Sequence, residues 1–235
     1  LRTPLNAILG FAQLLQSDND APLTETQQDS LKLIIHSGEH LLKLINDVLE
    51  LAKIETGTVD VSIEPVNVNI AIKHCLPMLK NLAARYRVSI HTDDIPDQLV
   101  LADLTKLKQV LINLVSNAIK YNRPDGKVII SGEVIDSTKR LRITIQDTGM
   151  GIPRDKQAYL FTAFDRLGQE NSDIEGTGVG LIVTKRLIKA MDGHIGFEST
   201  ENQGTRFWVE LPITDNKNQN DEVHQQTALI KAENP

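Results

Sequence analysis

The 235-residue sequence has few of the features that mark several protein classes. It has one cysteine, Cys75, which excludes an internal disulfide framework and fits a reducing compartment. Aromatic residues make up 4% of the chain, so any core should be aliphatic. No apolar run approaches the roughly 18 residues that would span a bilayer. No block is rich in lysine and arginine and the net charge is −6, which disfavours binding to nucleic acid or to an anionic membrane surface.

The remaining composition is that of a globular protein. With 40% hydrophobic residues, a chain of this length can bury the cores of one or two domains. We therefore expect a soluble, cytoplasmic piece whose macromolecular partners are proteins. A membrane-anchored sensor domain could lie upstream of Leu1.

The first quarter of the chain has the pattern of a helical hairpin. Residues 24–55 predict one long helix, with a capping box formed by Thr24 and Gln27 at its start and Gly57 as its stop. Its apolar positions recur at spacings of three and four, and so do those of a shorter first helix. The stripe is too wide for a two-stranded seam, so it favours a four-helix bundle. A hairpin supplies only two of the four helices, and we therefore expect a homodimer through residues 1–57.

From Glu64 onward, helices alternate with short strands. The pattern predicts helices over residues 67–86, from Asp103 as N-cap through Tyr121, and over residues 180–191, with Pro77 kinking or breaking the first of them. It predicts strands at residues 88–91 and 99–102, and hairpins that pair 127–135 with 140–145 and 195–199 with 205–211. Residues 152–176 suit a flexible lid, and the composition after Pro212 suits a disordered tail.

Two glycine runs suggest a nucleotide site. Residues 147–152 read Asp-Thr-Gly-Met-Gly-Ile, and residues 176–181 read Gly-Thr-Gly-Val-Gly-Leu. Asp147 ends a strand-like alternation, where its carboxylate could accept a hydrogen bond from an adenine amino group, and glycines let the backbone approach base and phosphates. Neither run is a Walker loop or a dinucleotide-binding fingerprint. Taken singly, each run could equally be a surface loop.

Two asparagines add a candidate metal site. Asn113 and Asn117 are four residues apart in a predicted helix, so they share a face. Amide oxygens near phosphates suit a hard Mg²⁺ ion, and Lys120 could reach a phosphate. The alternative is that both asparagines only decorate the polar face of an amphipathic helix.

Taken together in order, these motifs resemble the transmitter core of a two-component sensor histidine kinase, in the superfamily that includes gyrase, Hsp90 and MutL ATPases. The resemblance covers residues 1 to about 213. Leu-Arg-Thr-Pro-Leu-Asn at residues 1–6 resembles the continuation of the His box, and residues 113–121 resemble the Asn box. Residues 147–152, 161–166 and 176–181 resemble the first glycine box, the Phe box and the second glycine box.

The resemblance implies an α+β protein. A helical hairpin, residues 1–57, would form a dimeric four-helix bundle, and residues 64–213 would form a two-layer α/β sandwich with a mixed sheet that binds ATP. Residues 214–235 would be a tail or linker. Their end, Ala-Leu-Ile-Lys-Ala-Glu-Asn-Pro, also loosely resembles the opening strand of a receiver domain.

The family also implies roles for individual residues. Asn117 would be the main Mg²⁺ ligand with Asn113 assisting, and Lys120 a phosphate contact. Tyr121 would lie beside adenine, Asp147 would read it, and Arg166 would face the terminal phosphate, while Phe164 would pack the lid. Further nucleotide contacts would come from Gly149, Gly151, Ile152, Gly176, Thr177, Gly178, Val179, Gly180 and Leu181.

The family pattern favours phosphoryl transfer over hydrolysis. ATPase relatives place a glutamate base where Asn113 stands, and an amide cannot take a proton at neutral pH. The family's acceptor is a histidine two residues before the Leu-Arg-Thr-Pro run, upstream of Leu1, and the phosphate passes to an aspartate of a response regulator. The alternatives are an ATP-binding pseudokinase or dimeric scaffold, and a hydrolytic ATPase clamp. His36 and His40, one turn apart, could be solvated helix positions or an incomplete metal site.

Thr3 would lie one helical turn after that acceptor, on the same face. In the family pattern this hydroxyl positions a water that dephosphorylates the regulator. The alternative is that Thr3 only softens the helix before Pro4.

Overall fold

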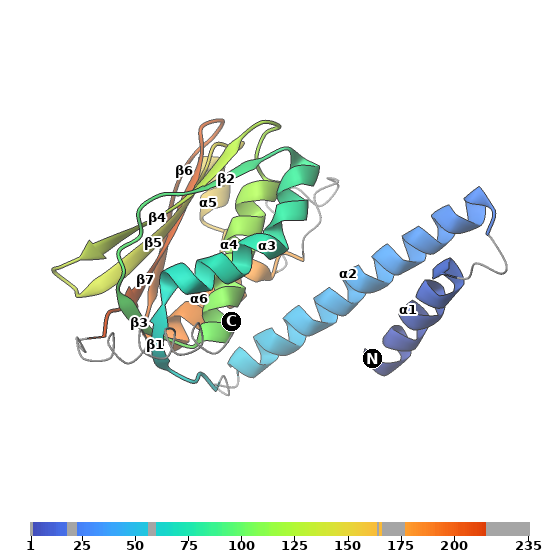
Figure 1. Cartoon of the computed structure of the whole chain (residues 1–235), viewed down its shortest axis with the longest axis horizontal. Helices are drawn as coiled ribbons and strands as arrows, with labels where there is room; N and C mark the ends of the chain where they lie inside the picture. Colours follow the sequence, from blue (N-terminus) through green and yellow to red (C-terminus); the bar gives the residue numbers. More distant parts are fainter. Residues whose placement is uncertain (1, 18–22, 56–59, 164, 166–176, 215–235) are drawn as a thin grey trace, which may run out of the picture.

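The computed structural model describes residues 2–17, 23–55, 60–163, 165 and 177–214 (Figure 1). The helices are α1 (Arg2–Ser17), α2 (Glu25–Glu55), α3 (Val68–Tyr86), α4 (Leu104–Lys120), α5 (Arg154–Gln157) and α6 (Gly180–Ala190). The strands are β1 (Glu64–Asn67), β2 (Ser89–Thr92), β3 (Leu99–Ala102), β4 (Lys127–Ile135), β5 (Arg140–Asp147), β6 (His194–Thr200) and β7 (Gly204–Pro212). The receiver-like end of the sequence lies outside the described residues.

Helices α1 and α2 run antiparallel as a hairpin beside the rest of the molecule (Figure 1). The capping box predicted at the start of α2 is present. The Thr24 backbone N–H donates to Gln27 Oε1 at 2.9 Å, and the Gln27 N–H donates to Thr24 Oγ1 at 3.3 Å. Each of these two side chains accepts the backbone N–H of the other residue, and this reciprocal pair fixes the first residue of the helix. Leu5 and Leu9 of α1 are buried against α2.

The hairpin also leaves a large apolar surface exposed. Among the side chains that the structure describes in the two helices, the exposed large apolar ones are Ile8, Phe11, Leu14, Leu15, Leu33, Ile34, Leu41, Val48 and Leu49. Ile34, Leu41 and Val48 repeat every seven residues, which places them in one row along α2. The described helices include none that is long and apolar enough to cross a membrane. This surface is what the predicted bundle would bury.

The second part of the chain is built on a mixed five-stranded sheet with the order β2-β4-β5-β7-β6, in which only β2 and β4 are parallel. Both predicted hairpins are present. A separate two-stranded sheet pairs β1 with β3. Strand β1 is absent from the sequence-based expectations because its four residues, Glu-Pro-Val-Asn, show no alternation. Its last residue, Asn67, is the N-cap of α3 and accepts a hydrogen bond from the Ile70 N–H.

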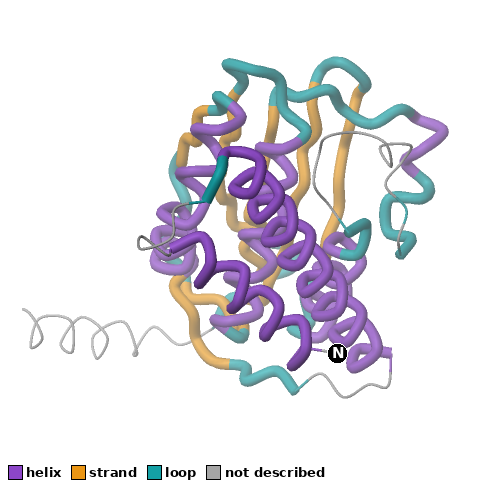
Figure 2. The backbone as a smooth tube through the Cα atoms, turned by 90° about the vertical axis from the view of Figure 1, so that its right-hand side faces the viewer, coloured by secondary structure: helices purple, strands orange, loops and turns teal. Residues whose placement is uncertain are grey.

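Helices α3, α4 and α6 cover one face of this sheet (Figures 1 and 2). The core between the layers is mainly aliphatic, as the composition predicts, with Phe207 as its buried aromatic residue among those described. Helix α3 continues through Pro77, so the proline does not break it. Asp103 caps α4 as predicted, because its Oδ1 accepts the Lys106 N–H at 3.0 Å.

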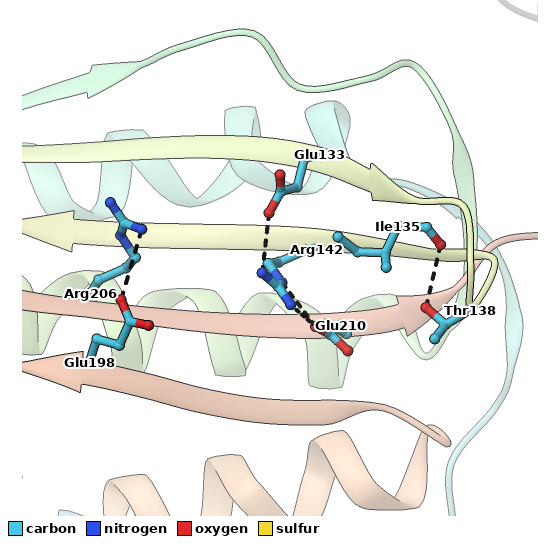
Figure 3. Close-up of polar contacts among 7 residues, drawn as sticks. All are labelled: Glu133, Ile135, Thr138, Arg142, Glu198, Arg206 and Glu210. Carbon is cyan, nitrogen blue, oxygen red and sulfur yellow. Dashed lines mark hydrogen bonds and ion pairs between the residues drawn. The ribbon is translucent and has the colours of Figure 1, made fainter.

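The other face of the sheet carries charged residues that pair with one another (Figure 3). Arg142 on β5 donates to Glu210 at 2.6 Å and to Glu133 at 3.3 Å, and its guanidinium carbon lies 5.4 Å from the centroid of the Trp208 ring. These partners compensate the charge of Arg142. The cavity of this domain is lined by other residues, among them residues of α4 and α6.

Candidate functional site

A cavity of about 920 Å³ opens where α4, the loop after β5, the start of α6 and the β6–β7 turn meet. Most of the residues predicted to contact a nucleotide line it. These are Asn113, Asn117, Lys120, Tyr121, Asp147, Gly151, Ile152, Thr177, Gly178, Gly180 and Leu181. The fold therefore brings together motifs that lie up to about 70 residues apart in the sequence.

Two described residues of the predicted site, Gly149 and Val179, do not line this cavity. Gly149 packs behind the wall against the Tyr121 carbonyl, and Val179 is fully buried as the N-cap of α6. Arg166 and Gly176 lie outside the described residues, as does Phe164. The lining also does not include Thr3, which is exposed on the first turn of α1.

Asp147 is the last residue of β5 and, among the described residues, the one charged residue that is buried, with 7% of its surface exposed. Its Oδ1 accepts the Gly149 N–H at 2.8 Å and the Thr205 N–H at 3.1 Å. Within the described part of the chain, its Oδ2 has no hydrogen-bond partner. Burial raises the pKa of Asp147 from its ordinary value of 3.8 to about 6, and the two N–H donors offset part of that rise. The carboxylate is thus held in place through one oxygen, and the described residues leave the other oxygen available as an acceptor.

The two asparagines on α4 differ in their contacts. Asn113 Nδ2 donates to Thr184 Oγ1 on α6 at 2.8 Å, and a Cβ at Gly180 would clash with Asn113 Oδ1. The half-buried Asn117 makes no side-chain hydrogen bond to any described residue, although it lines the cavity. An amide oxygen that has no partner among the described residues and borders a cavity fits a Mg²⁺ ligand. Asn117 is therefore the better candidate, and Asn113 also holds α4 against α6.

Other metal chemistry finds no support in the described residues. Among them, no three His, Cys, Asp or Glu side chains form a group that could hold an ion. His36 and His40 are exposed positions of α2.

The glycine loop after β5 is shaped by close backbone contacts. Gly151 has φ +65°, and a Cβ there would clash with the Thr200 carbonyl oxygen. A Cβ at Gly149 would clash with the carbonyl oxygen of Tyr121. Only glycine fits between these neighbours, so the loop packs directly against the end of α4 and the β6–β7 turn.

The opposite end of the cavity is the amino end of α6. Gly178, Gly180 and Leu181 line it, and the N-cap residue Val179 has no side-chain acceptor for the first N–H groups of the helix, while its own N–H donates to Thr177 Oγ1 at 3.4 Å. A helix start with unsatisfied N–H groups attracts anions. With Lys120 also in the lining, this end suits phosphates, while the Asp147 end suits a base.

Two family models match separate parts of the chain. The model for the His Kinase A (phospho-acceptor) domain matches residues 1–57, and that for the histidine kinase-, DNA gyrase B-, and HSP90-like ATPase matches residues 102–215. The chain belongs to the histidine kinase family. Both parts of the sensor histidine kinase core are therefore present in the chain.

Three relatives illustrate the match. The circadian input-output histidine kinase CikA of Synechococcus elongatus is 38% identical over 216 residues, which are 90% of this chain and 28% of CikA. The structure of full-length ShkA in complex with AMPPNP has a TM-score of 0.75 and 33% identity, covering 91% of this chain and 44% of ShkA. Histidine kinase ThkA in complex with response regulator protein TrrA shares the fold, with a TM-score of 0.63 and 24% identity over 91% of this chain and 58% of ThkA. This histidine kinase chain spans about a quarter of the length of its curated relatives.

Several residues of the histidine kinase site were not predicted from the sequence. Thr184 and Thr205 are buried threonines that bond to Asn113 and Asp147. Buried Asn122 donates through Nδ2 to two carbonyl oxygens and accepts at Oδ1 from the Arg123 N–H and from Thr148 Oγ1. Glu201 and Asn202 bring the β6–β7 turn into the lining. The only signal for Asn122 was its position directly after the Asn box.

Proposed function

We propose that this chain is the ATP-dependent core of a protein histidine kinase. It binds Mg-ATP in the cavity and passes the terminal phosphoryl group to a histidine two residues before the Leu-Arg-Thr-Pro run of the whole protein. The phosphoryl group then moves to an aspartate of a response regulator. The acceptor position rests on the family resemblance of residues 1–6.

One observation carries the nucleotide part of this proposal. Two groups that lack a partner within the described chain, Asp147 Oδ2 and the Asn117 amide, border one cavity. The free oxygen of Asp147 matches the exocyclic amino group of adenine, which is a donor. The Asn117 amide matches a metal ion that accompanies the phosphates.

The residues at the phosphate end favour transfer over hydrolysis. Asn113 cannot act as a base for water, because an amide is not protonated at neutral pH. Phosphoryl transfer instead needs positioning and neutralisation of charge. Bound Mg²⁺ would supply part of that neutralisation, and Lys120 with the N–H groups at the start of α6 would supply the rest. Arg166 is proposed to face the terminal phosphate.

A response regulator is the proposed receiver of the phosphate. ThkA is a kinase of the same fold seen with a response regulator. The match of residues 1–57 to the phospho-acceptor domain supports an acceptor in the helical part of the whole protein rather than in the nucleotide domain. The same match supports a homodimer through this hairpin.

Phosphate incorporation by the whole kinase tests the proposal. Wild type should label itself from γ-labelled ATP with acid-labile phosphate, and Asn117→Ala should lose both labelling and tight ADP binding. Asn81→Ala, a matched change at an exposed amide of α3, should retain both. A wild-type protein that binds ATP without labelling would instead be a pseudokinase or scaffold, and one that releases phosphate would be a hydrolase.

Thr3 gives a second proposed activity, dephosphorylation of the regulator. Its hydroxyl is exposed on the first turn of α1 and makes no hydrogen bond to a described residue, so it is available to orient a water. In the whole kinase, Thr3→Ala should slow dephosphorylation of a phosphorylated receiver domain while sparing self-labelling. The exposed Thr26→Ala of α2 serves as control. If both activities fall together, Thr3 has a structural role.

A further inference from the structure

The base end of the cavity is held by an arginine that does not itself line it. Arg123 follows α4 by three residues, and its Nη2 donates to the Gly149 carbonyl oxygen at 3.2 Å and to the Asn202 carbonyl oxygen. One guanidinium thus joins the glycine loop after β5 to the β6–β7 turn. The cavity lining does not include Arg123.

The two segments that Arg123 joins form one wall. The Asn202 N–H donates to the Met150 carbonyl oxygen at 2.6 Å, and the Met150 N–H donates to the Tyr121 carbonyl oxygen at 3.2 Å. Met150, Tyr121 and Asn202 all line the cavity, together with Asp147. The β6–β7 turn therefore contributes Asn202 to the cavity lining through its contacts with the glycine loop and with Arg123.

The backbone of Arg123 is also held in place by hydrogen bonds. Its backbone N–H donates to Asn122 Oδ1 at 2.9 Å, and Asn122 is buried and bonded to the Ala118 and Lys127 carbonyl oxygens. The arginine therefore extends from a rigid point at the end of α4. Asn202 lies in the left-handed region at φ +64°, so the turn it belongs to has a constrained shape.

We propose that Arg123 is a positioning residue for the nucleobase, which fastens the β6–β7 turn to the first glycine loop so that the wall around Asp147 keeps its shape. The proposal rests on the proposed nucleotide-binding function. In this role Arg123 affects binding of the base, and it does not affect the phosphoryl transfer at the other end of the cavity. Loss of Arg123 should therefore raise KM for ATP and leave kcat at saturating ATP nearly unchanged.

The structure offers a matched control in Arg140. It makes the same kind of contact, donating to the Asp192 carbonyl oxygen and to Asp192 Oδ2, and Asp192 is also in the left-handed region at φ +54°. Neither residue lines the cavity. Arg140→Ala thus removes an arginine that also bonds to a backbone carbonyl oxygen of a left-handed residue, with an ion pair in addition, and it should not affect the nucleotide.

The experiment measures self-labelling kinetics, ADP affinity by calorimetry and nucleotide-free melting for the whole kinase and its variants. Arg123→Ala should raise KM for ATP and Kd for ADP roughly three- to thirtyfold, the range expected if part of a charged hydrogen bond is lost from binding. Its kcat should stay within about twofold of wild type. Arg140→Ala should leave both constants unchanged, and Arg123→Lys should recover part of the affinity.

A double variant separates positioning from general damage. If Arg123 acts through the wall around Asp147, its removal should cost less affinity in an Asp147→Asn background than in wild type. Unchanged affinity in Arg123→Ala, or equal losses of kcat and of affinity, would overturn the proposal. If Arg123→Ala fails to fold, an Arg123→Lys protein with wild-type melting and wild-type affinity would overturn it too. Failure of wild type to bind ATP would instead reject the proposed function.

Discussion

At the scale of the residue, Asp147 shows a conflict between stability and function. Only 7% of its surface is exposed. Its Oδ1 accepts two N–H groups, whereas no described residue donates to its Oδ2. Burial of an incompletely paired charge costs free energy in the nucleotide-free protein. An adenine amino group would supply the missing donor, so binding would recover part of that cost.

Asp147→Asn should therefore stabilise the empty domain and weaken nucleotide binding. The Asn oxygen can still accept both N–H groups, while the buried charge is gone, so the free energy of unfolding at pH 8 should rise by up to about 3 kcal/mol, the equivalent of the pKa shift. The new NH₂ would face a donor, so ADP affinity should fall roughly ten- to a hundredfold. Thermal melting with and without ADP measures both effects.

Asp103→Asn is the control for this substitution. Asp103 caps α4 and lies outside the cavity lining, so the change should not alter ADP affinity. A lower melting temperature for empty Asp147→Asn would show that the carboxylate stabilises the fold instead.

The raised pKa of Asp147 also predicts opposite effects of pH on stability and on binding. Because its folded pKa of about 6 exceeds its ordinary 3.8, the folded state holds the proton more tightly. Its contribution to stability is present below pH 3.8 and is lost as the pH rises through about 6. ADP affinity should instead rise over the same interval, because the base needs the ionised acceptor. Calorimetry of wild type from pH 5 to pH 7.5 should show this rise, and Asp147→Asn should lack it.

At the scale of the element, the close approach of loops and helices explains why particular glycines occur. Gly151 combines a left-handed backbone with contact to a carbonyl oxygen, whereas nothing lies within 4 Å of a Cβ built on Gly10 in α1. Gly151→Ala should therefore destabilise the nucleotide domain by at least about 1–2 kcal/mol. Gly10→Ala should stabilise the hairpin by up to about 1 kcal/mol, because alanine favours helix. Urea unfolding followed by circular dichroism compares the two, and equal effects would mean that the contacts at Gly151 do not matter.

The elements were largely predictable from sequence, and the site only in part. Periodicity and caps predicted α2, α4 and the paired strands β4–β5 and β6–β7, because those patterns arise within each element. Strand β1 was missed, since four residues carry no period. Thr184, Thr205 and Arg123 were missed because their roles come from contacts 50 to 80 residues away along the chain. No local pattern records such contacts.

At the scale of the whole molecule, the nucleotide domain buries a continuous apolar core, whereas the hairpin leaves many of its large apolar side chains exposed. Leu5, Leu9 and Leu31 are buried between α1 and α2, yet the row formed by Ile34, Leu41 and Val48 is 42–49% exposed. Exposed apolar rows of this kind are stable in water when another helix pair covers them. A second copy of the hairpin is a partner with the same heptad spacing.

Lysines placed in this row should separate the dimer without harming the nucleotide site. In an Ile34→Lys, Leu41→Lys double variant, dimerisation would have to bury two charges on each chain, and an unpaired buried charge costs several kcal/mol. Light scattering of the protein that contains both the hairpin and the nucleotide domain should then give half the wild-type mass. ADP affinity should stay unchanged, because the described lining of the cavity includes no residue of α2. Gln28→Lys with Asn46→Lys adds the same charge at exposed polar positions and should remain dimeric. A lysine double variant that keeps the dimer mass would mean that another surface of the chain holds the two copies together.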